Sequence, residues 1–189
     1  MIIVFIGPPY AGKETQGKLL SQKFGNMPIF SMGGLIREAK ERGDKTFVKA
    51  YEEYSLKGFH LPTRIKFPLL KERMDQAEDG FILDNFPATK DDLSVFNNYL
   101  IKTNKRINRV FFLQISEEEM RKRLKNAFRG RKDDDYDIVI VRREIQDQDR
   151  TPVIEYYKNH NLLSEINGQK DIDKVHKEIL EELKSKDPI

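Results

Sequence analysis

Short apolar segments alternate along this chain with longer segments whose apolar residues recur every three or four positions. Five of the short segments are rich in Ile, Val, Leu and Phe, at residues 1–7, 27–31, 80–84, 109–115 and 161–167. Strands that are apolar on both faces are typical of a parallel sheet covered by helices on each side. The alternation therefore predicts an α/β fold of three layers, with a central parallel sheet of about five strands.

Helical signals fill the segments between these strands. Ser116 and Glu119 form a capping box, a paired signal that opens a helix. A second clear pattern lies near the C-terminus, where apolar residues recur every four positions at Val175, Ile179 and Leu183. Pro68 and Pro152 stand inside other helical patterns, and we expect each to kink or end its helix.

Length and composition exclude several classes of protein. The 189 residues can bury a real core in one domain. There is no cysteine, which excludes a disulfide framework and a cysteine-based zinc site. With 34 Lys and Arg against 31 Asp and Glu, the charge is too even to predict nucleic-acid binding. No apolar run approaches the roughly 18 residues of a membrane span, so we expect a cytoplasmic protein that binds no membrane.

The first apolar run leads directly into GPPYAGKETQ, residues 7–16. A glycine-rich turn between a buried strand and a helix presents backbone N–H groups and the positive helix end to phosphate oxygens, and Lys13 can bridge the outer phosphates. The strict pattern G-x-x-x-x-G-K-[ST] has a hydroxyl directly after the lysine. Here Glu14 takes that position and Thr15 follows. The segment predicts a phosphate-binding loop, with Glu14 turned away from the phosphates.

Small or polar residues end three of the predicted strands, namely Gly7, Ser31 and Asp84. The carboxyl ends of parallel strands lie along one edge of the sheet, and ligands bind beyond that edge. We therefore expect these three residues to share one site. The charged run at 117–137 is less decisive, because alternating charge also fits a solvated helix face. The three histidines, His60, His160 and His176, have no metal-ligand spacing.

The loop resembles that of the adenylate kinases, GxPGxGKGTQ, in which the threonine stands two places after the lysine, as Thr15 does here. Further segments resemble blocks of the same family, in family order and over essentially the whole chain. They are SMGGLIRE (31–38), KGFHLPTRI (57–65), GFILDNFPAT (80–89), FRGRKDDDYDIVIVRREI (128–145) and EINGQKDIDKV (165–175).

The resemblance implies a P-loop fold with two insertions in a single nucleoside monophosphate kinase domain, 1–189. The core would comprise 1–31, 80–122 and 143–189, with a monophosphate-binding insertion at about 32–79 and a short lid at about 123–142. Only about eight residues separate Arg123 from Arg131. With so short a lid and no cysteine, we expect no zinc.

The implied reaction is in-line phosphoryl transfer from ATP to AMP, giving two ADP. By motif match, Thr15 and Asp84 would hold Mg²⁺, largely through water and substrate phosphates. Neither a protein partner nor an oligomer is implied, and we expect a monomer. The residues that would carry the chemistry are Lys13, Arg37, Asp84, Arg123, Arg131 and Arg142.

The resemblance also implies two sets of nucleotide contacts. The ATP side would comprise Gly7, Tyr10, Ala11, Gly12, Lys13, Glu14, Thr15, Arg123 and Lys170. The monophosphate side would comprise Ser31, Met32, Arg37, Phe59, His60, Leu61, Asn85, Phe86, Ala88, Asp92, Arg131 and Arg142.

Several residues depart from the family pattern. Ala88 and Ala127 stand where the family has arginines, Asp92 where a glutamine reads the adenine edge, and Asn85 where a glycine is usual. Losing one buried charge partner costs about 2–5 kcal/mol, unless another cation has taken its place. The candidates for that compensation are Arg64, Lys66 and Lys90 on the acceptor side and Arg129 in the lid.

Two alternatives to an adenylate kinase stay open. The chain could bind nucleotides with little transfer activity, because Ala88 and Ala127 lack the arginine charge. It could also be a kinase of the CMP/UMP type or of another monophosphate. An ionised Asp92 only accepts hydrogen bonds, so it could bond the amino group of adenine or cytosine and would repel uracil. AMP is therefore the first expectation and CMP the second.

Overall fold

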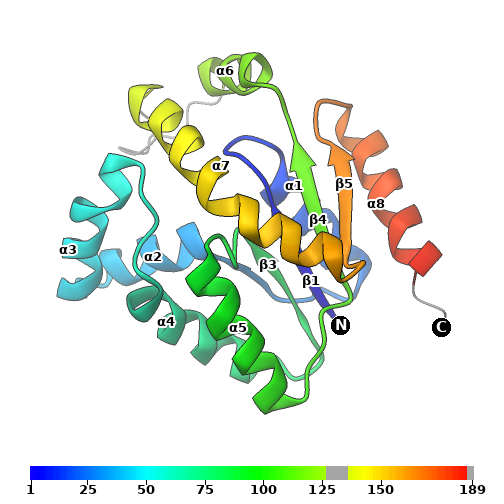
Figure 1. Ribbon diagram of the computed structural model, residues 1–189, viewed down its shortest axis with the longest axis horizontal. Coiled ribbons are helices and arrows are strands. Elements are labelled where there is room, and N and C mark those ends of the chain that lie inside the picture. Colours follow the sequence, from blue (N-terminus) through cyan, green and yellow to red (C-terminus); the bar gives the residue numbers. More distant parts are fainter. Residues whose placement is uncertain (127–135, 187–189) are drawn as a thin grey trace.

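A computed structural model describes residues 1–126 and 136–186 of the chain. Its five strands form one parallel sheet in the order β2-β3-β1-β4-β5 (Figure 1). The predicted α/β fold with a central parallel sheet is confirmed, and each predicted apolar segment contains one strand. The strands are β1 (Ile2–Ile6), β2 (Ile29–Ser31), β3 (Phe81–Asp84), β4 (Arg109–Gln114) and β5 (Leu163–Asn167).

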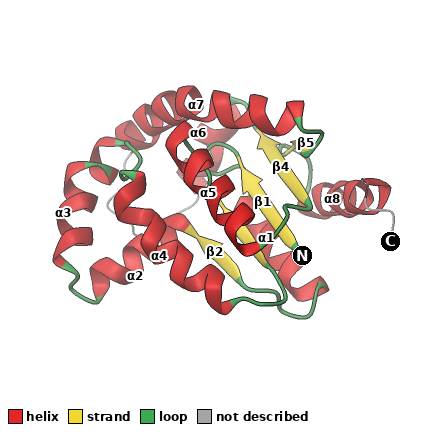
Figure 2. Cartoon of the chain, turned by 60° about the horizontal axis from the view of Figure 1, so that its bottom comes forward, coloured by secondary structure: helices red, strands yellow, loops and turns green. Residues whose placement is uncertain are grey.

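Helices connect these strands on both faces of the sheet (Figure 2). The Ser116 hydroxyl accepts the N–H of Glu119 at 3.1 Å, as expected for the start of a helix. Pro68 and Pro152 both lie within helices that continue past them. The elements are α1 (Lys13–Lys23), α2 (Met32–Glu41), α3 (Lys45–Glu53), the short 3₁₀ helix η1 (Ser55–Lys57), α4 (Thr63–Gln76), α5 (Lys90–Thr103), α6 (Glu117–Asn126), α7 (Tyr136–Asn159) and α8 (Ile172–Lys186).

The central strand β1 is buried along its whole length because each of its faces packs on a separate apolar cluster. Ile2, Val4 and Ile6 face a cluster built mainly with α2, α3, α4, α5 and α7. Ile3 and Phe5 face the opposite cluster, built mainly with α1, α6 and α8. The period-two alternation of side chains across a strand accounts for this division. In the described ranges, no helix is both long and apolar enough to cross a membrane.

The segment between β2 and β3 forms an arm of helices that reaches one end of α7. In Figure 1 this arm, with α2, α3 and α4, lies on the left. Gly58, which follows η1, has a φ of +83°, and a Cβ built there would lie 2.9 Å from the backbone nitrogen of Arg142. Because a side chain at this point would enter the backbone of α7, glycine is what lets the arm and α7 meet.

Candidate functional site

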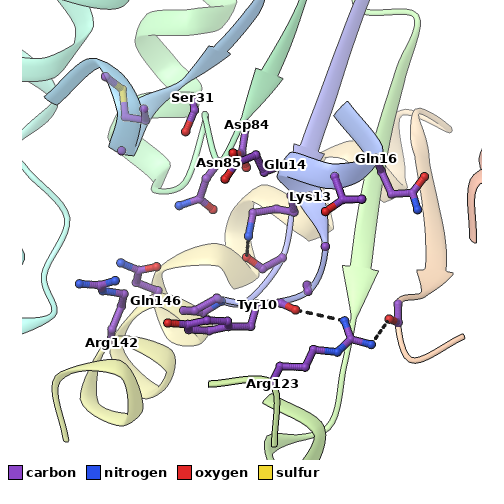
Figure 3. A pocket seen from close by; sticks show the side chains of 18 of the residues that line it. Tyr10, Lys13, Glu14, Gln16, Ser31, Asp84, Asn85, Arg123, Arg142 and Gln146 are labelled. Atoms are coloured by element: carbon purple, nitrogen blue, oxygen red, sulfur yellow. Dashed lines mark hydrogen bonds between the residues drawn. The ribbon is translucent and has the colours of Figure 1, made fainter. Parts of the chain in front are cut away.

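A cavity of about 1200 Å³ opens at the carboxyl ends of the strands. Its wall combines the loop after β1, the ends of β2 and β3, the arm, α6, α7 and the turn after β5 (Figure 3). Pockets for one drug-sized ligand usually hold roughly 300–1,000 Å³. The volume of this cavity lies just above that range.

The loop after β1 has the backbone that a phosphate cradle needs. Gly7 has a φ of +148°, and a Cβ there would lie 2.4 Å from the carbonyl oxygen of Leu113. Gly12, with a φ of +94°, caps α1. Lys13 Nζ donates to the carbonyl oxygens of Gly7 at 3.0 Å and Pro8 at 2.9 Å. The ammonium thus lies across the loop, where phosphate oxygens could replace these carbonyl partners.

Two residues adopt the left-handed backbone at positions where the family pattern has glycine. Tyr10 and Asn85 both have a φ of +62°. Asparagine tolerates this conformation, whereas for tyrosine it costs about 1–2 kcal/mol. The Tyr10 ring lies between the loop and the start of α7 (Figure 3). The Tyr10 side chain packs against the apolar cluster of α1, α6 and α8. We infer that this packing offsets the free-energy cost of the left-handed backbone.

Glu14 lies on the cavity wall, and its expected direction away from bound phosphates stays a prediction. Its carboxylate lies on the cavity wall beside Asp84 (Figure 3). It also accepts a hydrogen bond from Lys18 at 2.8 Å, and both side chains are more than half exposed. The lysine partner and solvent allow a negative charge to be tolerated next to a phosphate-binding loop.

Asp84 ends β3 beside the loop, and its Oδ1 is covered without a hydrogen-bond partner among the described residues. Burial raises the pKa of this carboxyl, while Lys13 and a hydrogen bond from Ser31 act in the opposite direction. An orphaned carboxylate oxygen near Thr15 suits Mg²⁺, which binds one or two protein oxygens together with water and phosphates. The described residues contain no cluster of three acidic or histidine ligands, and Mg²⁺ bound with phosphates does not need one.

Arg37 projects from α2 into the cavity. A Cβ on Gly33 would lie 3.2 Å from Nη1 of Arg37. The glycine therefore leaves room for the guanidinium to fold back over the start of its own helix. Ser31 caps that helix, since its hydroxyl accepts the N–H of Gly34.

The structure corrects the role expected of Asp92. Its side chain is 0% exposed, and it does not line the cavity. Oδ1 accepts the Thr63 hydroxyl at 2.6 Å, and Oδ2 accepts Lys66 Nζ at 2.7 Å and the N–H of Ala88 at 3.1 Å. Both carboxylate oxygens are therefore occupied by protein donors. Asp92 is not available to read a base directly.

His60 also lines the cavity, with its Nε2 covered and without a hydrogen-bond partner among the described residues. Burial lowers its pKa well below the ordinary value, and the charges of Lys66, Arg150 and Arg142 lower the pKa further. The imidazole is therefore neutral at pH 7. A neutral ring with a free nitrogen suits contact with a base or ribose.

This shift makes stability depend on pH. Between the depressed folded pKa and the unfolded value near 6.5, only the unfolded chain binds the proton at His60. The free energy of unfolding should therefore fall as the pH drops below about 6.5, by at most about 1.4 kcal/mol per pH unit. Urea titrations from pH 7 to pH 5 measure the slope. His60→Asn should flatten it and His160→Asn, at an exposed site, should not. Equal slopes in both variants would contradict the assignment.

Arg142 and Gln146 project from α7 into the cavity, opposite Lys13 (Figure 3). Arg123, on α6, instead donates to the carbonyl oxygens of Tyr10 at 3.1 Å and Gly168 at 2.8 Å, and pairs with Glu119 at 2.7 Å. Three of its five N–H donors are thus engaged. In this conformation Arg123 braces the loop against the turn after β5.

Most residues predicted for the site share this one cavity. Gly7 and residues 10–15, Ser31, Met32, Arg37, Phe59, His60, Leu61, Asp84, Asn85, Arg123, Arg142 and Lys170 all line it. Phe86, Ala88 and Asp92 are buried and do not line it. Arg131, Arg129 and Ala127 lie outside the described residues.

The sequence reading missed Gln16 and Gln146 on the cavity wall. Gln16 is buried and bonds the Ile172 carbonyl and the His176 ring. Its place directly after Thr15, within the quoted loop, could have identified it. Gln146 had no such signal, because it stands four residues after Arg142 in an ordinary charged helix pattern.

Comparison with known proteins gives consistent matches along the chain. A family model described as adenylate kinase matches residues 5–162. The adenylate kinase of Archaeoglobus fulgidus is 34% identical, and the alignment covers 98% of this chain and 100% of the relative. Adenylate kinase 1 of a Nostoc species is 34% identical, with 97% and 96% covered. The adenylate kinase of a Prochlorococcus marinus strain is 32% identical, with 92% and 93% covered.

Proposed function

Because this chain belongs to the adenylate kinase family, we propose that it transfers the γ-phosphoryl group of ATP to AMP, giving two ADP. The observation that carries the proposal is a single cavity with a phosphate loop on one wall and Arg37, His60 and Leu61 on another. A site of this form can hold a donor and an acceptor nucleotide end to end. In-line transfer needs that arrangement.

In the proposed reaction, a phosphate oxygen of AMP attacks the γ-phosphorus, and the bond to the β,γ-bridging oxygen breaks. The attacking oxygen is already anionic, so no protein base has to remove a proton. The protein supplies position and positive charge. Lys13 would contact the outer phosphates of ATP, Arg37 the acceptor phosphate, and Arg142 the phosphoryl group in transfer.

Four further residues have proposed roles in this arrangement. Thr15 and Asp84 would hold Mg²⁺, largely through water and phosphate oxygens, and the bound ion neutralises phosphate charge. Arg123 would fix the loop through its bonds to Tyr10 and Gly168. Arg131 stays a proposed contact of the transferred group, from its place in the family motif alone.

The experiment is a panel of acceptors. The purified protein is incubated with ATP, Mg²⁺ and AMP, CMP, UMP or GMP, and ADP and the second diphosphate are followed by chromatography. We expect turnover with AMP to exceed that with each other acceptor, and no ADP when the acceptor is omitted. Binding of ATP without transfer to any acceptor would instead support the nucleotide-binding alternative. Faster turnover with CMP or UMP would assign the pyrimidine type.

A further inference from the structure

The acceptor end of the cavity contains a buried ion pair that the proposed reaction does not yet use. The side chains of Lys66 and Asp92 are 2% and 0% exposed, and their charged atoms lie 2.7 Å apart. Thr63 and the N–H of Ala88 bond the same carboxylate. A buried pair is tolerated when further hydrogen bonds satisfy its lone pairs. This carboxylate has them, so the ammonium is held in a fixed position.

Of the two partners, only Lys66 lines the cavity. An ammonium has three N–H donors, and within the described residues Asp92 is the one hydrogen-bond acceptor for it. Donors therefore remain for a bound molecule. The other acceptor-side cations suggested by the sequence, Arg64 and Lys90, are exposed and absent from this cavity wall.

The surroundings of Lys66 fit a planar base better than a phosphate. Leu61 and His60, a few positions earlier in the chain, also line the cavity. The Lys66 ammonium lies 5.8 Å from the centre of the Phe86 ring. Pairing with Asp92 at 2.7 Å fixes the position of the ammonium, so it offers directed donors and not a mobile charge. Arg37 and Arg142 retain the role of phosphate contacts.

We propose that Lys66, positioned by Asp92, hydrogen-bonds a ring nitrogen or carbonyl oxygen on the base of the acceptor nucleotide. This inference rests on the proposed function, because it assumes that the acceptor binds at this end of the cavity. It reverses the chemistry expected from the sequence. The site presents a donor to the base where Asp92 would have presented an acceptor.

The test compares AMP with ribose 5-phosphate, which has the phosphate but no base. Lys66→Met alone would leave Asp92 buried without its partner, so the variant is Lys66→Met with Asp92→Asn. Thermal unfolding checks that it folds, and calorimetry gives both dissociation constants.

We expect the dissociation constant for AMP to rise about tenfold, as for loss of one buried charged donor. That for ribose 5-phosphate should change less than twofold. Arg64→Met, two residues away, should change neither.

Three other binding results would overturn the inference. An equal rise in the dissociation constants for AMP and ribose 5-phosphate would assign Lys66 to the phosphate. An unchanged dissociation constant for AMP, or a wild-type protein that binds no AMP, would show that Lys66 does not contact the base. If the double variant does not fold, the wild-type protein with isotope-labelled lysine decides. The Lys66 ammonium resonance should then shift with AMP and not with ribose 5-phosphate. These are binding measurements, so a protein that binds AMP as expected but forms no ADP would refute the proposed function alone.

Discussion

Replacing Lys13 with alanine should reduce kcat for phosphoryl transfer by roughly 10²–10³-fold, as for removal of one preorganised charge-stabilising donor. In the structure its ammonium already lies across the loop, 3.0 Å or less from the carbonyl oxygens of Gly7 and Pro8. Its charge would meet the phosphate oxygens whose negative charge shifts during transfer. ATP affinity should change less than tenfold, because the backbone N–H groups and the start of α1 still bind the phosphates.

The measurement is a steady-state assay with saturating ATP and AMP, together with calorimetric titration of ATP. Lys23→Ala is a matched control, since it removes an exposed lysine from the same helix outside the cavity. We expect that control to keep kcat within twofold. A Lys13→Ala variant that retains more than a tenth of wild-type kcat would show that Lys13 does not stabilise the transferred group.

Gly58→Ala should separate the arm from α7 and weaken acceptor binding. The alanine Cβ would lie 2.9 Å from the nitrogen and 3.1 Å from the Cα of Arg142. Both are backbone atoms, so α7 has to move, and Arg142 and Gln146 move with it. The Gln146 amide, which donates to the Gly58 carbonyl at 3.5 Å, would lose that partner. We expect the KM for AMP to rise about tenfold or more. Displacement of a positioned group by about 1 Å can lower a reaction rate by about 10²-fold, and Arg142 and Gln146 would be displaced here.

Gly43→Ala supplies the control for backbone strain. Gly43 has a φ of +79°, close to that of Gly58, but no atom of the described residues lies within 4 Å of a Cβ built there. Its substitution should cost only the left-handed penalty, about 1–2 kcal/mol in urea unfolding, with the KM for AMP unchanged. Gly58→Ala should cost more than this. Equal effects of the two variants on stability and on KM would mean that contact between the arm and α7 does not position the acceptor site.

The strands and the glycine-rich loop after β1 were predictable because their signals are contiguous in the sequence. Each buried strand is a run of apolar residues, and Gly7, Gly12 and Lys13 stand within a few positions of one another. Asp84 was predictable for a related reason. It ends an apolar run, and the ends of parallel strands share one edge. Local signals therefore place these residues at strand ends, and the pairing of β1 with β3 brings them together.

The role of Asp92 could not be predicted in this way. Its pairing with Lys66 joins residues 26 positions apart, on two helices that only packing brings together. A lysine in a helix is ordinarily solvated, and no periodic pattern distinguishes a buried one. Arg123 is similar, since its contacts with Tyr10 and Gly168 span 113 and 45 positions.

The sequence by itself thus determined the parallel α/β sheet and the glycine-rich turn after β1, while its resemblance to a known family indicated many of the residues that line the cavity. The sheet and the turn follow from apolar periodicity and from a short motif, whose backbone conformations depend on neighbouring residues. Only the tertiary structure decided which polar groups are free to meet a ligand. Both Asp92 carboxylate oxygens accept protein donors, and Lys66 lines the cavity. Gly58 lets α7 approach the arm. Burial and hydrogen-bond satisfaction depend on contacts between distant segments, and those contacts exist only once the chain has folded.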